Sequence, residues 1–138
     1  MKENKLRILL VDDNDALNFL HAKLCDLNLP DAEVKCVPDG RQAIDFLEEN
    51  KTALKDCVVL ILLDIRMPVM DGWAFLETIQ TNPVDANHHI VMLTSSTTTE
   101  DRKRAMGYQS VMGYLEKPLR GFQLIELSQK LEQEASNM

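Results

Sequence analysis

Long hydrophobic runs are missing from this sequence. Its most apolar stretch, Val58–Leu63, has six residues, whereas a membrane-spanning helix needs about 20. Residues 1–7 are mostly polar and charged and do not resemble a secretory signal peptide. We therefore expect a cytoplasmic protein that has no membrane association.

An excess of positive charge is also missing. The 15 basic residues are outnumbered by 22 acidic ones, and the resulting net charge of −7 argues against a chain that binds nucleic acid by itself. Cysteine is scarce as well. Cys25, Cys36 and Cys57 are an odd number without CxxC spacing, and they are too scattered to suggest a zinc site. We expect three reduced and mostly buried thiols.

Repeats, low-complexity segments, linkers and the phosphate-binding loops GxxxxGK[ST] and GxGxxG are absent too. The lack of such a loop disfavours a nucleotide-binding protein. With 138 residues, 45% of them hydrophobic, the chain has the size of one compact domain. We expect residues 1–138 to form a single domain, with no output domain after the last predicted helix.

What the sequence does contain is an apolar strand that ends in a carboxylate. Val58–Leu63 is uniformly apolar, as in a strand buried on both faces of a parallel sheet. Asp64 follows it directly, before a Met-Pro turn and an Asp-Gly pair. Because α/β proteins bind ligands outside the carboxyl ends of their strands, Asp64 is the first candidate for a functional residue.

Strand and helix patterns alternate five times along the chain. The predicted strands are Leu6–Val11, Glu33–Val37, Val58–Leu63, His89–Leu93 and Val111–Leu115. The predicted helices are Asn14–Leu27, one opened by Asp39 and Gly40, one capped by Asp71, one opened by a capping box at 97–100 and ending near Gly107, and one over about Leu119–Gln133. This alternation is typical of an α/β fold with a doubly wound parallel sheet and helices on both faces.

Two finer expectations concern local structure. The first helix has leucines at helical spacing, which predicts that they form its buried face: Leu17, Leu20, Leu24 and Leu27. His21, in the same helix, is interpreted as a surface or flanking residue. The segment Lys51–Cys57 is predicted to be a polar connection into the strand that ends at Asp64.

Polar residues gather where the predicted strands end: Asp12, Asp13, Asp64, Thr94 and Lys117. In a parallel sheet these ends share one edge, so we expect the side chains to converge. Three neighbouring carboxylates repel one another unless cations compensate. Lys117 supplies one positive charge, and Mg²⁺, which suits carboxylates that leave positions for water and phosphate, supplies two. Such a site fits phosphoryl transfer to Asp64 as the nucleophile.

Four segments, in order and with compatible spacing, resemble a known family over about residues 5–132: LLVDDN, LLDIRMPVMDG, VMLTSS and YLEKP. They resemble the receiver domain of two-component response regulators, in particular stand-alone receivers like those of chemotaxis. The resemblance implies a flavodoxin-like (βα)5 fold with strand order 2-1-3-4-5.

For the metal, the resemblance implies that Asp13 binds Mg²⁺ directly, that Asp12 acts through water, and that Asp64 and the backbone carbonyl of Arg66 complete the protein's ligands. For the chemistry, it implies that Asp64 is phosphorylated and that the Thr94 hydroxyl and the Lys117 ammonium approach the phosphoryl group.

The resemblance further implies that Tyr114 is a switch residue that moves inward with Thr94, and that the Lys117–Pro118 bond is cis. Two positions depart from the usual pattern: Arg66 stands where many receivers have a smaller residue, and Ser96 is small and neutral. In the family both positions border the phosphoryl group.

The function implied is that of a receiver rather than of an enzyme. It takes a phosphoryl group from a sensor histidine kinase or a histidine phosphotransfer protein. It then changes the face made by the helix after 97–100, the strand Val111–Leu115 and the last helix, and so signals to a separate downstream protein. A monomer or a weak, phosphorylation-dependent dimer is expected.

Two other functions are compatible with part of this pattern. A haloacid-dehalogenase-type hydrolase also phosphorylates an aspartate at a strand end, but it needs a second Asp two residues later, where this chain has Arg66. A receiver fold that serves as a phosphorylation-independent interaction module remains the alternative.

Overall fold

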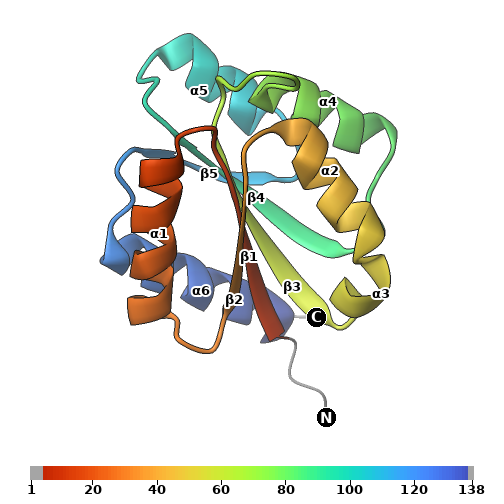
Figure 1. Ribbon diagram of the computed structural model, residues 1–138, viewed down its shortest axis with the longest axis vertical. Coiled ribbons are helices and arrows are strands. Elements are labelled where there is room, and N and C mark those ends of the chain that lie inside the picture. Colours follow the sequence, from red (N-terminus) through yellow and green to blue (C-terminus); the bar gives the residue numbers. More distant parts are fainter. Residues whose placement is uncertain (1–4, 137–138) are drawn as a thin grey trace.

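The molecule is built around a parallel sheet of five strands. In the computed structural model, which describes residues 5–136, the strands are β1 (Lys5–Val11), β2 (Glu33–Val37), β3 (Cys57–Leu63), β4 (Asn87–Thr94) and β5 (Val111–Glu116). Their order is β2-β1-β3-β4-β5, and every neighbouring pair is parallel (Figure 1). The predicted α/β class and flavodoxin-like strand order are confirmed. The ends of the single domain predicted over 1–138, residues 1–4 and 137–138, lie outside the described residues.

Helices cover both faces of this sheet. They are α1 (Asp15–Asn28), α2 (Gly40–Glu49), α3 (Lys51–Leu54), α4 (Gly72–Thr81), α5 (Thr99–Met106) and α6 (Gly121–Ser136). The buried apolar residues of α1 and α6 belong to one cluster, and those of α2, α3, α4 and α5 belong to the other. Figure 1 shows α1 on one side and α2 and α3 on the opposite side. None of these helices within residues 5–136 combines the length and the apolar character that a membrane span requires.

Strand β3 shows how the sequence pattern produces two cores. All seven of its residues are buried, and successive side chains of a strand point to opposite faces. Val58, Leu60 and Leu62 accordingly enter the cluster with α1 and α6, and the alternate residues of β3 enter the other cluster. A uniformly apolar strand is therefore compatible only with the centre of a sheet that is covered twice.

Three details differ from the prediction. The segment predicted as a polar connection contains the one-turn helix α3, which was not predicted and which places Leu54 in the core. The N-cap of α5 is Thr98, which accepts from the backbone N–H of Asp101, one residue later than the predicted capping box. The last helix begins at Gly121 rather than near Leu119. The predicted cap of α4 is confirmed, because the Asp71 side chain accepts from the Ala74 N–H.

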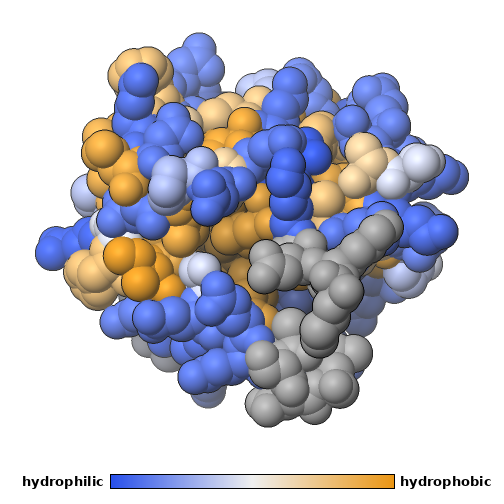
Figure 2. All heavy atoms as spheres, turned by 90° about the horizontal axis from the view of Figure 1, so that it is seen from below, coloured by the Kyte–Doolittle hydropathy of each residue, from blue (hydrophilic) through white to orange (hydrophobic). Residues whose placement is uncertain are grey.

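The predicted leucine face of α1 is buried only in part, with Leu24 packed against the apolar cluster that contains Cys25. Leu20 is 45% and Leu27 79% exposed, and apolar side chains gather on the left of the underside, the α1 side of the molecule (Figure 2). The buried residues of α1 are instead Asn18, His21 and Cys25. Two of these are polar because α1 faces buried backbone groups that need hydrogen-bonding partners. The expectation that His21 lies on the surface is wrong.

Of the three cysteines, all free, Cys25 and Cys57 are buried and Cys36 is exposed. Burial is the largest influence on Cys25 and raises the pKa of its thiol to about 12. This thiol therefore stays protonated and behaves as an apolar core group.

Among residues 5–136, Val69 is the residue with a positive φ angle, 66°. It is the central residue of a γ-turn that the Met70 N–H closes onto the Pro68 carbonyl at 2.7 Å. A β-branched residue is strained in this left-handed region, and Val69 is 83% exposed, so burial of its side chain does not offset the strain.

We predict that Val69→Gly stabilises the protein by about 0.5–1 kcal/mol. Relief of the left-handed conformation, worth about 1–2 kcal/mol, exceeds the extra chain entropy that glycine brings to the unfolded state, about 0.5–1 kcal/mol. Urea unfolding measures the change. Val69→Ala, which removes the β-branch but retains a Cβ at positive φ, is the matched control and should gain less. A glycine variant no more stable than the wild type would contradict the prediction.

Candidate functional site

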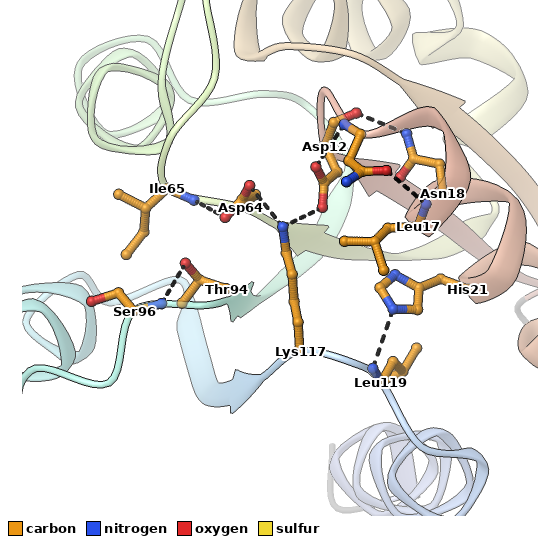
Figure 3. Close-up of polar contacts among 11 residues, drawn as sticks. Asp12, Leu17, Asn18, His21, Asp64, Ile65, Thr94, Ser96, Lys117 and Leu119 are labelled. Atoms are coloured by element: carbon orange, nitrogen blue, oxygen red, sulfur yellow. Dashed lines mark hydrogen bonds and ion pairs between the residues drawn. The ribbon is translucent and has the colours of Figure 1, made fainter.

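The polar residues at the ends of the strands meet at one edge of the sheet. Val11 pairs with Leu63 in the β1–β3 register, so the residues that follow them, Asp12 and Asp64, lie side by side (Figure 3). The backbone N–H of Asp64 donates to the Val11 carbonyl at 3.0 Å, and that of Asp12 donates to the Val37 carbonyl at 3.1 Å. The predicted convergence is confirmed, and its cause is the parallel topology.

Lys117 connects the two buried carboxylates. Its Nζ lies 2.6 Å from Oδ2 of Asp12 and 2.9 Å from Oδ2 of Asp64 (Figure 3). Burial alone would lower the pKa of Lys117, but the hydrogen bonds and charges of both carboxylates outweigh it, so the pKa is raised. The ammonium therefore stays charged. The Lys117 N–H also donates to the Thr94 carbonyl at 2.9 Å, and the following bond, to Pro118, is cis as expected.

Asp13 completes an acidic cluster with these two carboxylates. One oxygen from each of Asp12, Asp13 and Asp64 lies within 4.8 Å of the others, and Asp13 is exposed whereas the other two are buried. Three carboxylates and one ammonium leave two negative charges uncompensated, which a divalent cation balances. An all-oxygen donor set that is open to solvent on one side fits Mg²⁺, which keeps several of its waters.

The backbone around Asp64 is held by a close approach of helix α4. Asp64 Oδ1 accepts from the N–H of Ile65 at 2.8 Å, and the Ile65 carbonyl accepts from the N–H of Gly72 at 2.7 Å. A Cβ on Gly72 would lie 2.4 Å from the carbonyl oxygen of Asp64. Gly72 therefore does more than shape a turn, because only glycine lets α4 begin this close to the phosphoacceptor candidate.

A cavity of about 460 Å³ opens beside Asp64. Arg66, which is exposed, lines one part of it, and Thr94 with the hydroxyl residues 95–98 lines the rest. Thr94 is buried, and its Oγ1 accepts from the Ser96 N–H at 3.3 Å. The Tyr114 hydroxyl donates to the Ser96 carbonyl at 3.0 Å. Thr94 and Tyr114 are thus attached to the same loop, although they come from different strands.

Comparison with known proteins agrees with this geometry. The family model of the response regulator receiver domain matches residues 8–129. The chain belongs to the response regulator receiver family. Among solved structures, a two-component response regulator from Cytophaga hutchinsonii is 26% identical with a TM-score of 0.81, and covers 95% of this chain and 99% of its own. A CheY-like receiver domain protein from Methanospirillum hungatei is 27% identical with a TM-score of 0.73, over 98% of this chain and 100% of its own.

Relatives of this receiver differ in length. The probable methanogenesis regulatory protein FilR2 of Methanothrix harundinacea is 32% identical over 85% of this chain and 75% of its own length. The transcriptional regulatory protein HprR of Escherichia coli is 32% identical over 82% of this chain but only 45% of its own length. The matched region is therefore the receiver, and the remainder of the longer relatives lies outside the similarity.

Two residues beneath the receiver's site escaped the sequence analysis. Asn18 Nδ2 donates to the backbone carbonyl of Asp12 at 2.8 Å, and His21 Nε2 accepts from the backbone N–H of Leu119 at 3.2 Å (Figure 3). His21 is 1% exposed. Two polar residues one turn apart in a leucine-rich helix could have indicated a buried polar contact. The spacing of the leucines, however, predicted that a different face of the helix is buried.

We predict that His21 makes the receiver less stable below about pH 6.5. Burial lowers the pKa of His21. The negative charge of Asp12 opposes this shift, and the positive charge of Lys117 adds to it. On acidification His21 is therefore protonated first in the unfolded chain, near the ordinary histidine pKa of 6.5. The unfolding free energy then falls by up to about 1.4 kcal/mol per pH unit until the folded protein is protonated as well. Above this range His21 is neutral in both states and contributes no pH dependence.

Urea unfolding of the wild type and of His21→Gln between pH 5 and 8 checks this. Glutamine does not titrate, so the stability difference between the two proteins should be constant above about pH 7 and should shift toward the variant below about pH 6.5. Carboxylates and the other histidines are common to both chains and cancel. A difference independent of pH would contradict the prediction.

Proposed function

We propose that this receiver accepts a phosphoryl group on Asp64 from the phosphohistidine of a sensor kinase or of a histidine phosphotransfer protein. The observation that carries the proposal is the Lys117 ammonium, held between Asp12 and Asp64 at the edge of an acidic cluster. The carboxylate of Asp64 is positioned to attack phosphorus, and the fixed cation beside it neutralises the charge of the transferred group.

In the proposed step an Asp64 carboxylate oxygen forms a bond to phosphorus. The bond between phosphorus and the donor imidazole nitrogen breaks, and that nitrogen keeps the electron pair and takes up a proton. The product is an acyl phosphate on Asp64. Lys117, already 2.9 Å from Oδ2 of Asp64, then pairs with a phosphoryl oxygen with little movement.

Mg²⁺ would be held by Asp13 as a direct ligand and by Asp12 through water. Asp64 and the backbone carbonyl of Arg66 would complete the protein's ligands. When bound, the ion supplies positive charge to the phosphoryl oxygens. The solvent-exposed position of Asp13 favours its assignment as the direct ligand, because the Asp12 oxygen Oδ2 is already engaged by Lys117.

The cavity beside Asp64 gives the donor a route. Its hydroxyl-lined wall and Arg66 offer donors to phosphoryl oxygens. Ser96 contributes less than its place suggests, because its hydroxyl donates to Asp101 Oδ2 at 2.6 Å. Arg66 is the one cation among the residues that line this cavity, so we assign to it an influence on how fast the phosphoryl group arrives and leaves.

The response we propose is a change of the face made by α5, β5 and α6. A phosphoryl group attracts the Thr94 hydroxyl, which shifts the loop whose Ser96 carbonyl holds Tyr114. Helix α5 is suited to such a shift, since Ala105 is its buried residue. Two ring contacts also attach it, with Arg104 4.1 Å from the Trp73 ring centre and Arg102 5.7 Å from that of Tyr114, and its Asp101 accepts from the Ser96 hydroxyl.

This face, which includes Met106, Tyr108, Met112, Tyr114 and Glu116, would carry the signal to a separate protein. On this proposal the chain catalyses no reaction on a separate substrate, and it acts as a monomer or as a weak dimer after phosphorylation. Direct binding of nucleic acid is not part of the proposal, given the net charge of −7.

The test is incubation with a small-molecule phosphodonor, with Mg²⁺ or with a chelator, followed by intact-mass measurement. We expect the wild type to gain one phosphoryl group only with Mg²⁺, and Asp64→Asn to gain none. Asp71→Asn is the matched control: it makes the same chemical change at a helix cap outside the cluster, where asparagine also caps well. It should behave as the wild type.

Failure of a folded wild type that binds Mg²⁺ to gain mass would overturn the proposal. It would favour the phosphorylation-independent interaction module instead. Equal gains by the wild type and Asp64→Asn would place the reaction on a different residue.

A further inference from the structure

Helix α1 contacts the chain segment that carries Lys117. His21 Nε2 accepts from the backbone N–H of Leu119, two residues after Lys117, at 3.2 Å (Figure 3). Both residues are buried, so water does not compete for this hydrogen bond. An apolar residue at position 21 would leave the Leu119 N–H buried without this acceptor, which is unfavourable.

The segment after Lys117 also approaches α1 closely at Gly121. A Cβ on Gly121 would lie 2.6 Å from Nδ2 of Asn28, at the end of α1. That amide is directed to the Leu24 carbonyl at 2.8 Å and is therefore not free to move away. The connection from β5 to α6 thus runs along α1, with His21 as its hydrogen-bonding contact and Gly121 as its point of closest approach.

One turn before His21, the same helix holds the other end of the ion pair. Asn18 Nδ2 donates to the carbonyl of Asp12 at 2.8 Å, and Asp12 Oδ2 receives the Lys117 ammonium. Lys117 directly follows β5, and its backbone N–H donates to the Thr94 carbonyl, which fixes the direction of the chain at this point. Asn18 and His21, the two buried polar residues of α1, therefore set the position of Asp12 and of the backbone just beyond Lys117.

We propose that His21 is a positioning residue for Lys117, which it holds in reach of Asp64 through the backbone of Leu119; its effect on phosphorylation rests on the proposed function. His21 touches neither the phosphoryl group nor Lys117 itself in this assignment. It fixes the path of the main chain, and the lysine side chain inherits its direction from that path.

Two variants separate this role from a general effect on folding. In His21→Gln the side-chain carbonyl oxygen lies about as far from the backbone as Nε2 and can accept from the Leu119 N–H. His21→Asn is also a neutral amide but is one methylene shorter and cannot reach. The pair thus differs in the hydrogen bond and hardly in chemistry. Urea unfolding confirms that each variant is folded at the temperature of the assays.

The first readout is independent of phosphorylation. In nuclear magnetic resonance spectra we expect the Leu119 amide hydrogen to exchange slowly in the wild type and in His21→Gln, and at least tenfold faster in His21→Asn. The Lys117 ammonium signal, sharpened by its two carboxylate partners, should persist in the first two proteins and broaden or shift in the third. An unchanged Lys117 signal in His21→Asn would overturn the positioning role.

The second readout is the rate of phosphorylation by a small-molecule donor at saturating Mg²⁺, with Mg²⁺ affinity measured by calorimetry. Misplacement of a reacting group by a fraction of an ångström to an ångström costs on the order of tenfold or more. We expect His21→Asn to be slowed about tenfold with its Mg²⁺ affinity within about twofold of wild type, and His21→Gln to recover most of the rate.

Three results would reject the inference for the reaction: equal rates for the two variants, loss of Mg²⁺ affinity in parallel with the rate, or faster Leu119 exchange without any loss of rate. The failure of the proposed function looks different. In that case the wild type takes up no phosphoryl group, while the Leu119 and Lys117 signals still decide whether His21 positions the lysine.

Discussion

The ion pairs of Lys117 with Asp12 and Asp64 are the interaction on which the arrangement of the site depends. Two buried carboxylates at one sheet edge are unfavourable without a cation, and this ammonium lies within 3 Å of both. The lysine comes from the far end of the chain, so the charge pairing ties β5 to β1 and β3 across the sheet. The contacts that fix the backbone around Lys117, with the Thr94 carbonyl and with His21, therefore also fix where the ammonium lies relative to the carboxylates.

Much of the fold was predictable because its signals are local and strong. The apolar run of β3 and the cap at Asp71 each specify an element by themselves, and strict alternation of strands and helices leaves few topologies for them. Convergence of Asp12, Asp64 and Lys117 then followed from parallel strands alone. The strand order came from resemblance to receivers, since nothing in the periodicity of β2 or β5 says which edge each occupies.

The failures have a different physical origin. Helix α3 has four residues, too few for a periodic signal, and only the packing of Leu54 into the core specifies it. The face of α1 was misassigned because its partner is a backbone N–H 98 residues away, and side-chain hydropathy says nothing about such a group. The bridging of two carboxylates by Lys117 was likewise beyond the sequence, which predicted proximity but not which oxygen each group would engage.

Charge balance connects this geometry to the proposed response. One divalent cation would neutralise the three carboxylates and one ammonium, and the proposed conversion of Asp64 into an acyl phosphate would add negative charge at the same place. The Thr94 hydroxyl, at the end of the neighbouring strand β4, lines the same cavity as Asp64, and its oxygen accepts from the Ser96 N–H. Turning that hydroxyl toward phosphate disturbs this contact, and the Ser96 carbonyl also holds Tyr114. Helix α5 is attached by Ala105, by two ring contacts and by the hydrogen bond between Ser96 and Asp101. Because it lacks a broad apolar face, repacking there disrupts few buried contacts.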